Sequence, residues 1–290
     1  MSKSGKIELF IDQFWFIHTA MSHNLFNVRI DDYTEVEVFD MVRKWLVGNQ
    51  PRMIVTPNAE FLLKARSNES FRNLLSSSDL SVADGVAIRF GIAALQNEKL
   101  INRITGVDLV QHIARICNEE KKSLMLLGGA PMAAELASEI LIKRFPDLKV
   151  TSFDPGHIEY KNGKFSVPDA LKDELQNKPP DAIAVALGQG KQEVCMNEIR
   201  KLGYNVKVMI GIGGALDMIS GMKRRSPQWM SRIGLEWVWR LLIEPKRAKR
   251  ILKATIVFPC VVALETIKQG KFFKACRNVF PEVFRQLRGL

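Results

Sequence analysis

The sequence is poor in the residues that build metal and redox sites. Its four cysteines, Cys117, Cys195, Cys260 and Cys276, lie far apart and form no C-x-x-C pair. This spacing predicts reduced thiols in a cytosolic compartment. The four histidines do not cluster with carboxylates at the spacing of metal ligands, so we expect no catalytic zinc site.

Several motifs and segments that define other classes of protein are also missing. The chain has no P-loop and no G-x-G-x-x-G fingerprint followed by an acidic residue, which argues against an ATP-binding protein and a Rossmann-type oxidoreductase. Its N-terminus does not have the features of a cleaved signal peptide. The longest apolar run, 254–264, is shorter than the ~20 residues of a membrane-spanning helix and contains Pro259.

Basic residues, by contrast, are abundant but unevenly distributed. The formal net charge is +11, yet residues 222–290 alone contain sixteen Lys and Arg against four Glu. The first 221 residues are therefore close to neutral, with a net charge of −1. A basic tail on a neutral body predicts an anionic partner at one end: membrane lipid, nucleic acid or a phosphorylated substrate.

Short, nearly continuous apolar runs alternate with amphipathic segments between about Leu25 and Gly221. Such runs are typical of strands buried on both faces, and the alternation predicts βαβ units. We therefore predict an α/β fold with a Rossmann-like, mostly parallel sheet flanked by helices. The expected strands are 53–56, 123–128, 149–153, 181–188 and 206–211, and the expected helices are 34–47, 107–120, 132–145, 168–176 and 192–201.

The tail has a helical pattern of another kind. GLEWVWRLLIEP places apolar residues on one helical face until Pro245, and KRAKRILK at 246–253 is a basic helix start or turn. In KFFKACRNVF at 271–280, one face is apolar and the other carries Lys271, Lys274 and Arg277. This favours a helix at a membrane interface, although a helical pair packed on the body, or a nucleic-acid-binding tail, also fits. The apolar face comprises Phe272, Phe273, Cys276, Val279 and Phe280.

These patterns divide the chain into three parts. We predict an N-terminal extension at 1–24, an α/β domain at 25–221 and a basic, amphipathic helical C-terminal appendage at 222–290. Ligands of parallel sheets bind beyond the carboxyl ends of the strands. Candidate functional residues are therefore sought in the loops that follow strands.

Two such loops carry polar side chains. VTPNAEF at 55–61 offers the hydroxyl of Thr56 and the amide of Asn58, although Thr-Pro-Asn is also a common turn and helix cap. SVADGVAI at 81–88 places Asp84 at a strand-to-helix corner. Partial burial there would raise the pKa of Asp84 towards that of a general base, although Asp-Gly is also a frequent turn sequence.

Three further loops contain glycine or long polar side chains. LLGG at 126–129 and GIGGALD at 211–217 let backbone N–H groups approach a phosphate, or allow a helix to pack closely on a strand. LGQGKQE at 187–193 carries side chains able to bond a sugar, a uracil or a phosphate, or simply to face solvent at a helix start. The candidates in these loops are Gly128, Gly129, Gly213, Gly214, Lys191 and Gln192.

Seven segments in order resemble one family. The chain is similar to the WecG/TagA/CpsF glycosyltransferases, glycosyltransferase family 26, from about Leu25 to Arg250. This resemblance implies an inverting enzyme that moves a hexose, N-acetylmannosamine in the best-known members, from a UDP-sugar to a polyprenyl-diphosphate-linked sugar for cell-surface polysaccharide. The segments are VTPNAEF, SVADGVAI, NRITGVDL (102–109), SLMLLGG (123–129), PDAIAVALGQGKQE (180–193), GIGGALDMISGMKRRSPQWM (211–230) and GLEWVWRLLIEPKRAKR (234–250).

The resemblance also assigns roles to residues. Asp84 matches the family's proposed base, Thr56 matches a donor-site threonine, and Asn58 lies in the same motif. Arg103 and Gln192 match residues of the site. In this family the appendage is thought to dock on the membrane and complete the site with arginines that reach the diphosphate. The matching tail arginines are Arg240, Arg247 and Arg250.

No D-x-D triplet occurs, although many sugar-nucleotide transferases use one to hold a metal on the diphosphate. We therefore predict a metal-independent transfer without a cofactor, in which cations and backbone amides neutralise the diphosphate. We expect a cytoplasmic protein, peripheral on the inner face of the bacterial plasma membrane, that binds no nucleic acid; a homo-oligomer is left open. The alternative is a non-catalytic nucleotide- or lipid-binding module. The enzyme hypothesis requires Thr56, Asp84 and Gln192 to line the same cavity.

Overall fold

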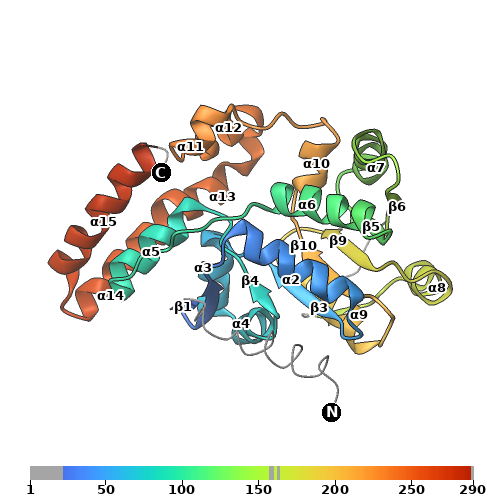
Figure 1. The fold of residues 1–290 in the computed structure, drawn as a ribbon. Helices are drawn as coiled ribbons and strands as arrows, with labels where there is room; N and C mark the ends of the chain where they lie inside the picture. The colour runs from blue at the N-terminus through green and yellow to red at the C-terminus, as the bar shows by residue number, and fades with distance from the viewer. Residues whose placement is uncertain (1–21, 157–159, 162–163, 289–290) are drawn as a thin grey trace, which may run out of the picture.

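The computed structural model describes residues 22–156, 160–161 and 164–288, and a six-stranded parallel sheet forms its centre (Figure 1). The strand order is β4–β3–β10–β9–β5–β6, and every neighbouring pair is parallel. The first and last of these strands in the chain, β3 and β10, therefore lie side by side. The strands are β3 (Arg52–Val55), β4 (Leu80–Ser81), β5 (Ser123–Gly128), β6 (Lys149–Phe153), β9 (Ala182–Ala186) and β10 (Val208–Gly211).

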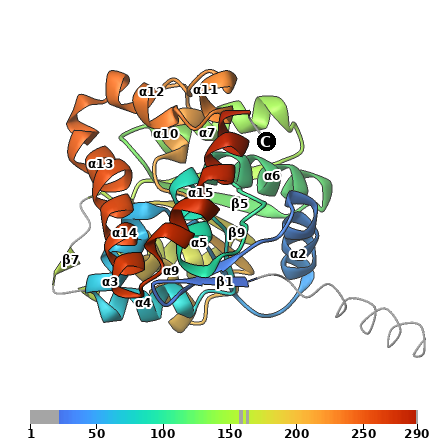
Figure 2. The ribbon, with the colours of Figure 1, turned by 90° about the vertical axis from the view of Figure 1, so that its left-hand side faces the viewer.

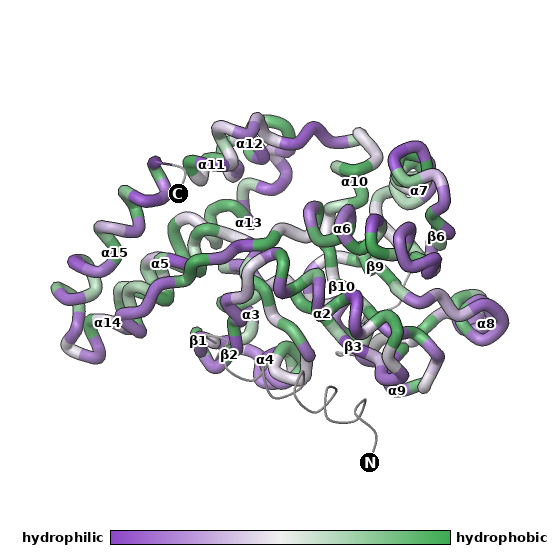
Figure 3. Tube along the Cα trace, in the orientation of Figure 1, coloured by the Kyte–Doolittle hydropathy of each residue, from purple (hydrophilic) through white to green (hydrophobic). Residues whose placement is uncertain are grey.

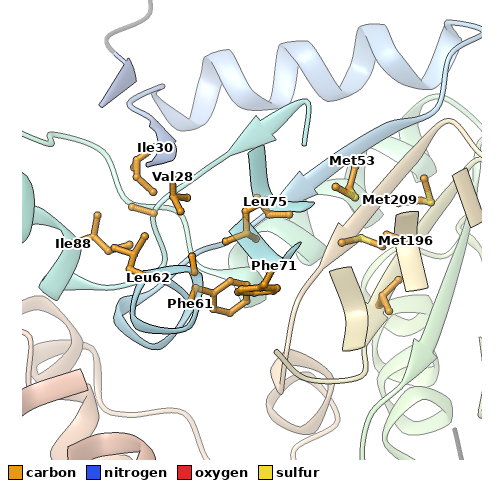
Figure 4. Close-up of a cluster of buried hydrophobic side chains, with 14 of the residues drawn as sticks. Val28, Ile30, Met53, Phe61, Leu62, Phe71, Leu75, Ile88, Met196 and Met209 are labelled. Carbon is orange, nitrogen blue, oxygen red and sulfur yellow. The ribbon is translucent and has the colours of Figure 1, made fainter. Parts of the chain in front are cut away.

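Helices cover both faces of the sheet, because its central strands are apolar on both sides. All residues of β9 and β10 are buried. One core lies between the sheet and α3, α4, α5, α8 and α9, and a second lies between the sheet and α2, α6, α7 and α10. Figure 4 shows Met53 and Met209 of the strands beside Met196 of α9 in the first core. The helices are α2 (Glu35–Val47), α3 (Ala59–Ser67), α4 (Glu69–Ser76), α5 (Val86–Gln96), α6 (Gly106–Glu119), α7 (Ala133–Arg144), α8 (Asp169–Asn177), α9 (Lys191–Lys201) and α10 (Ala215–Ile219).

The predicted α/β fold with a Rossmann-like parallel sheet is confirmed. Each of the five predicted strands and five predicted helices is present, the largest difference being that strand 181–188 is shortened to β9. Two hairpins, which were not predicted, lie outside the central sheet. They are β1 (Ser22–Leu25) with β2 (Val28–Asp31), and β7 (Tyr160–Lys161) with β8 (Lys164–Phe165).

The hairpin β1–β2 begins inside the segment predicted as an N-terminal extension. Its turn residues Phe26 and Asn27 have φ of 54° and 60°, a left-handed conformation that asparagine tolerates well. Leu25 and Val28 on either side of the turn are fully buried. The hairpin therefore contributes to the first core, and residues 1–21 of the predicted extension lie outside the described residues.

The C-terminal helices pack on the body through α14, α15 and α5 (Figure 2). Phe258 is only 1% exposed, and a Cβ atom on Gly91 of α5 would lie 3.2 Å from its ring and 2.9 Å from Leu25. Glycine at position 91 thus allows the close approach. The helices of this region are α11 (Gln228–Arg232), α12 (Glu236–Ile243), the 3₁₀ turn η1 (Pro245–Arg247), α13 (Ala248–Leu252), the π turn η2 (Lys253–Val257), α14 (Phe258–Lys268) and α15 (Phe272–Leu287).

The two prolines of this region have different effects. Pro245 lies in the 3₁₀ turn between α12 and α13, in agreement with the predicted break. Pro259 does not end a helix, because the π turn η2 precedes it and the Phe258 N–H bonds to the Lys253 carbonyl. In the parts of the chain that the structure describes, no helix has both the length and the hydrophobicity needed to cross a bilayer.

Candidate active site at the carboxyl edge of the sheet

The loops that follow five of the strands surround a cavity of about 270 Å³. Thr56 follows β3, Asp84 follows β4, and Gln192 lies in the first turn of α9, after β9. All three side chains line this cavity, as the enzyme hypothesis requires. Of the other predicted site residues, the same cavity is lined by Asn58, Gly129, Gly213, Gly214, Arg240, Arg247 and Arg250.

A second cavity of about 220 Å³ adjoins the first and is lined by the body and the tail in nearly equal parts. Its walls come from the start of α5 and from α12 and α13, and Arg103 lines it. Asp84, Glu236 and the three tail arginines line both cavities. Asp84 is therefore placed where a molecule in one cavity meets a molecule in the other.

Asp84 has the environment of a general base. Its N–H bonds to the Pro57 carbonyl at 2.9 Å, which fixes the corner between β4 and α5. Burial raises the pKa of the Asp84 carboxyl to about 6, and the nearby Glu236 carboxylate adds to this rise, while Arg240 and Arg103 oppose it. A carboxyl with this pKa is ionised at neutral pH and is basic enough to accept a proton.

Thr56 and Asn58 have structural roles within the site. The Thr56 hydroxyl donates to the Gly211 carbonyl at 3.0 Å, which joins the ends of β3 and β10. The Asn58 side chain accepts hydrogen bonds from the Glu60 and Phe61 N–H groups and caps α3. Asn58 thus caps a helix, as the structural interpretation expects, and it also lines both cavities, so its role in binding stays a prediction.

Gln192 is the centre of a buried hydrogen-bond chain. Its Oε1 accepts from the Gly213 N–H at 2.8 Å, and its Nε2 donates to Glu193 Oε1 at 2.6 Å. Glu193 Oε2 in turn accepts from the Gly190 N–H at 2.6 Å. Burial raises the pKa of Glu193 to about 7. The chain fixes the position of the turn at 211–217, and Glu193, though part of the LGQGKQE motif, was not singled out from the sequence.

The glycine-rich turns already use some of their amides within the protein. The Gly129 N–H donates to the Ala186 carbonyl at 3.0 Å, and the Gly213 N–H donates to Gln192. Gly128 does not line either cavity; a Cβ atom there would lie 2.6 Å from Leu187, so its glycine serves the packing of β5 beside the β9 loop. Lys191 is exposed and also lies outside both linings.

Each tail arginine of the site is held by a carboxylate. Arg240 pairs with Glu236, Arg247 with Glu244, and Arg250 with Glu60, each at 2.6 Å. The pairs place three guanidinium groups over the cavities before any ligand binds. An anionic ligand would add to these contacts or replace the carboxylates.

Three further residues that line the first cavity are charged and were not predicted. The Asp217 carboxylate accepts from the Ala130 N–H at 3.1 Å and pairs with Lys223 at 2.5 Å. Arg225 pairs with Asp108 at 2.9 Å. Asp217, Arg225 and Glu236 all lie within segments that carry the family resemblance. Their position in these segments could have marked them as candidates.

A parallel sheet with a polar, arginine-rich cavity beyond the carboxyl ends of its strands is typical of α/β proteins that bind phosphorylated ligands. The model of the glycosyl transferase WecG/TagA/CpsF family matches residues 23–272, which is most of the chain. This protein belongs to that family, and the match extends beyond the 25–250 of the predicted resemblance.

Two relatives show the extent of the similarity. A protein of Bacillus subtilis (strain 168) is 30% identical over 200 residues, which cover 69% of this chain and 75% of the relative. A protein of Staphylococcus aureus (strain MRSA252) is 25% identical over 253 residues, 86% of this chain and 95% of the relative. Each is named N-acetylglucosaminyldiphosphoundecaprenol N-acetyl-beta-D-mannosaminyltransferase.

Proposed function

We propose that this protein transfers a hexose from a UDP-sugar to a polyprenyl-diphosphate-linked sugar, with inversion at the anomeric carbon. The names of the relatives favour N-acetylmannosamine as the hexose and N-acetylglucosaminyl-diphospho-undecaprenol as the acceptor. The observation that carries the proposal is the position of Asp84 at the junction of two cavities that share three arginines.

The donor and the acceptor take different cavities in this proposal. The cavity at the strand ends, with Thr56, Asn58 and Gln192, takes the UDP-sugar. The cavity between α5, α12 and α13 takes the diphosphate and sugar of the acceptor. This division brings the acceptor hydroxyl and the anomeric carbon together beside Asp84.

The reaction is a single displacement. The acceptor oxygen forms a bond to the anomeric carbon while Asp84 accepts its proton, and the bond from that carbon to the UDP oxygen breaks. The electron pair of the broken bond leaves with UDP. Arg240, Arg247 and Arg250 stabilise the charge that develops on the diphosphate. The single N–H donors of Gly129 and Gly213 are already used within the protein. A guanidinium has five N–H donors and keeps some of them beyond its carboxylate pair, so we assign this role to the arginines.

We also propose that the protein acts at the membrane surface and that the transfer requires no metal ion. The tail carries a net charge of +12, and its outer surface exposes aromatic side chains of α15. Together these favour binding to an anionic bilayer on the side where the acceptor lipid resides.

A donor panel tests the proposed function. Full-length protein in detergent is mixed with a short-chain lipid-diphosphate sugar and, in turn, several UDP-hexoses, with and without added divalent metal. We expect product from one UDP-hexose, UDP-N-acetylmannosamine, at equal rates in both conditions. Binding of UDP without transfer from any donor would support the non-catalytic module instead.

A further inference from the structure

A third cavity of about 400 Å³ lies between the tail and the body, and apart from Thr266 and Cys276 its lining residues are apolar. It is a groove between α5, α14 and α15, which pack against one another (Figure 2). Small residues, among them Ala87, Gly91 and Ala263, line it together with phenylalanine side chains of α5, α14 and α15. Among the described residues that line the groove, none is charged.

The groove begins where the second cavity ends. Ala87, in the first turn of α5, lines both. From there α5 supplies one wall of the groove, while the helical run that carries Arg250 and Ala254 into the second cavity continues as α14 along the other wall. The second cavity, which contains Asp84 and the tail arginines, is therefore continued along α5 by a groove whose lining residues carry no charge.

The orientation of α15 keeps the third wall apolar. Gln286 accepts a hydrogen bond from Arg89 Nη1 at 3.2 Å and donates to the Arg232 carbonyl at 2.6 Å. These bonds fix the buried side chain of Gln286 between α5 and the end of α11, whereas the cations Lys274 and Arg277 of α15 stay exposed.

On the apolar side of α15, Ala275 is buried against the groove and Phe280 is 64% exposed at its edge. Hydrophilic and hydrophobic residues alternate along the trace of α15 (Figure 3). The wall that α15 gives to the groove is therefore apolar, and it is open to solvent at Phe280.

We propose that this groove, here called the prenyl groove, binds the part of the acceptor's polyprenyl chain next to its diphosphate. The inference rests on the proposed function, because it takes the second cavity as the acceptor site. The surfaces follow one another in the same order as the parts of the acceptor. The Asp84 carboxylate lies where the sugar hydroxyl would bind, the arginines follow for the diphosphate, and the apolar groove follows for the polyprenyl chain. The exposed phenylalanines of α15 continue the path towards the bilayer that holds the rest of the chain.

Adjacent residues of α14 provide a matched pair of variants. Ala263 lines the prenyl groove, whereas Leu264 points out of it and is exposed. The readout is the KM for two acceptors with the same sugar diphosphate, one on a long polyprenyl chain and one on a single isoprene unit, in detergent micelles. We expect Ala263→Trp to reduce the advantage of the long chain at least tenfold, since loss of two buried methylene groups has about that effect. Leu264→Trp should preserve the advantage.

A second pair on the opposite wall keeps the test valid if Ala263→Trp does not fold. Val283 of α15 lines the prenyl groove and Phe284 does not, so Val283→Trp should act like Ala263→Trp and Phe284→Trp like Leu264→Trp. An unchanged ratio of the two KM values in both groove variants overturns the proposal. Loss of binding to acceptor-free vesicles by the groove variants alone would also overturn it, because it would make the groove a membrane contact.

Binding of a sugar-free polyprenyl diphosphate separates this inference from the proposed function. If the unaltered protein transfers no hexose to either acceptor, the proposed function fails, but titration calorimetry with this lipid still reports on the groove. Weaker binding by Ala263→Trp than by Leu264→Trp supports the prenyl groove. Equal binding by the two variants rejects it.

Discussion

Residues 22–221 and residues 222–288 differ in what they leave exposed to solvent. Of the 23 large apolar side chains exposed in the described residues, sixteen belong to the shorter C-terminal region. That region also carries the net charge of +12, whereas the body is close to neutral. A region that exposes apolar side chains beside many cations is suited to a surface that is both apolar and anionic.

The two regions nevertheless form one site. The body supplies Asp84 and the polar ends of β3 and β9, and the tail supplies three arginines that line the same cavities. Phe258 of the tail is buried in the core of the body. The comparison therefore predicts that chemistry depends most on the body, charge neutralisation on the tail, and membrane binding on the outer face of the tail alone.

Asp84→Asn gives the largest expected effect. The change keeps the size of the side chain and removes the base, so kcat should fall by roughly 10²–10⁴-fold, while the Kd for UDP, measured by calorimetry, stays within about twofold. Glu236→Gln is the control, because Glu236 lines the same two cavities but its carboxylate is already paired with Arg240. If Asp84→Asn kept near-normal turnover and Glu236→Gln lost it, the general base would be Glu236 of the tail and not Asp84.

Arg250→Gln tests the part of the tail that completes the site. Loss of a charged hydrogen bond to the diphosphate should lower kcat/KM by about 10- to 100-fold. Lys249→Gln is matched to it, since Lys249 is the preceding residue of α13, is exposed and lines neither cavity. Both variants lose one positive charge and should bind anionic vesicles equally. Equal kcat/KM values for the two variants would show that Arg250 contributes only to membrane binding and not to binding of the diphosphate.

Activity should also depend on pH through Asp84. Its pKa is raised to about 6, so kcat should rise about tenfold per unit below pH 6 and level off above it. Stability should change in the opposite direction. A carboxyl whose pKa is raised by folding stabilises the fold fully below its unfolded pKa, and this stabilisation is lost as pH rises through 6. Asp84→Asn should therefore gain stability over the unaltered protein at pH 8 but not at pH 4, in denaturant titrations.

The sequence indicated the body more completely than the tail, for physical reasons. Strands buried on both faces have nearly continuous apolar runs, so β5 and β9 could be located, and the strand-end rule then placed Asp84. Helix α5 was implied only by the strand-to-helix corner at Asp84, and its bounds were not predicted. It packs against β1 on one side and against α14 and α15 on the other. Its sequence is apolar over most of its length, with Arg89 as its one charged residue, and such a run resembles a buried strand as much as a buried helix.

The missed site residues depend on contacts between distant parts of the chain. Glu236 matters because folding brings it to within electrostatic range of Asp84, a neighbour more than 150 positions away. The rotation of α15 likewise depends on Arg89 and Gln286, which bond across the two regions. Periodicity revealed that α15 is amphipathic, but not that Gln286 would be buried against α5.

Phe273→Ser has the smallest expected effect and tests the outer face of the tail. Phe273 is 87% exposed and does not line the prenyl groove, so its loss should leave the KM for acceptor in detergent unchanged. Binding to anionic vesicles, measured by flotation, should weaken about three- to tenfold, because one partly inserted aromatic side chain is removed. Val36→Ser is the matched control, since Val36 of α2 is 69% exposed on the body. Equal vesicle binding by both variants would show that the cations alone hold the tail on the membrane, and that its exposed apolar side chains serve another contact.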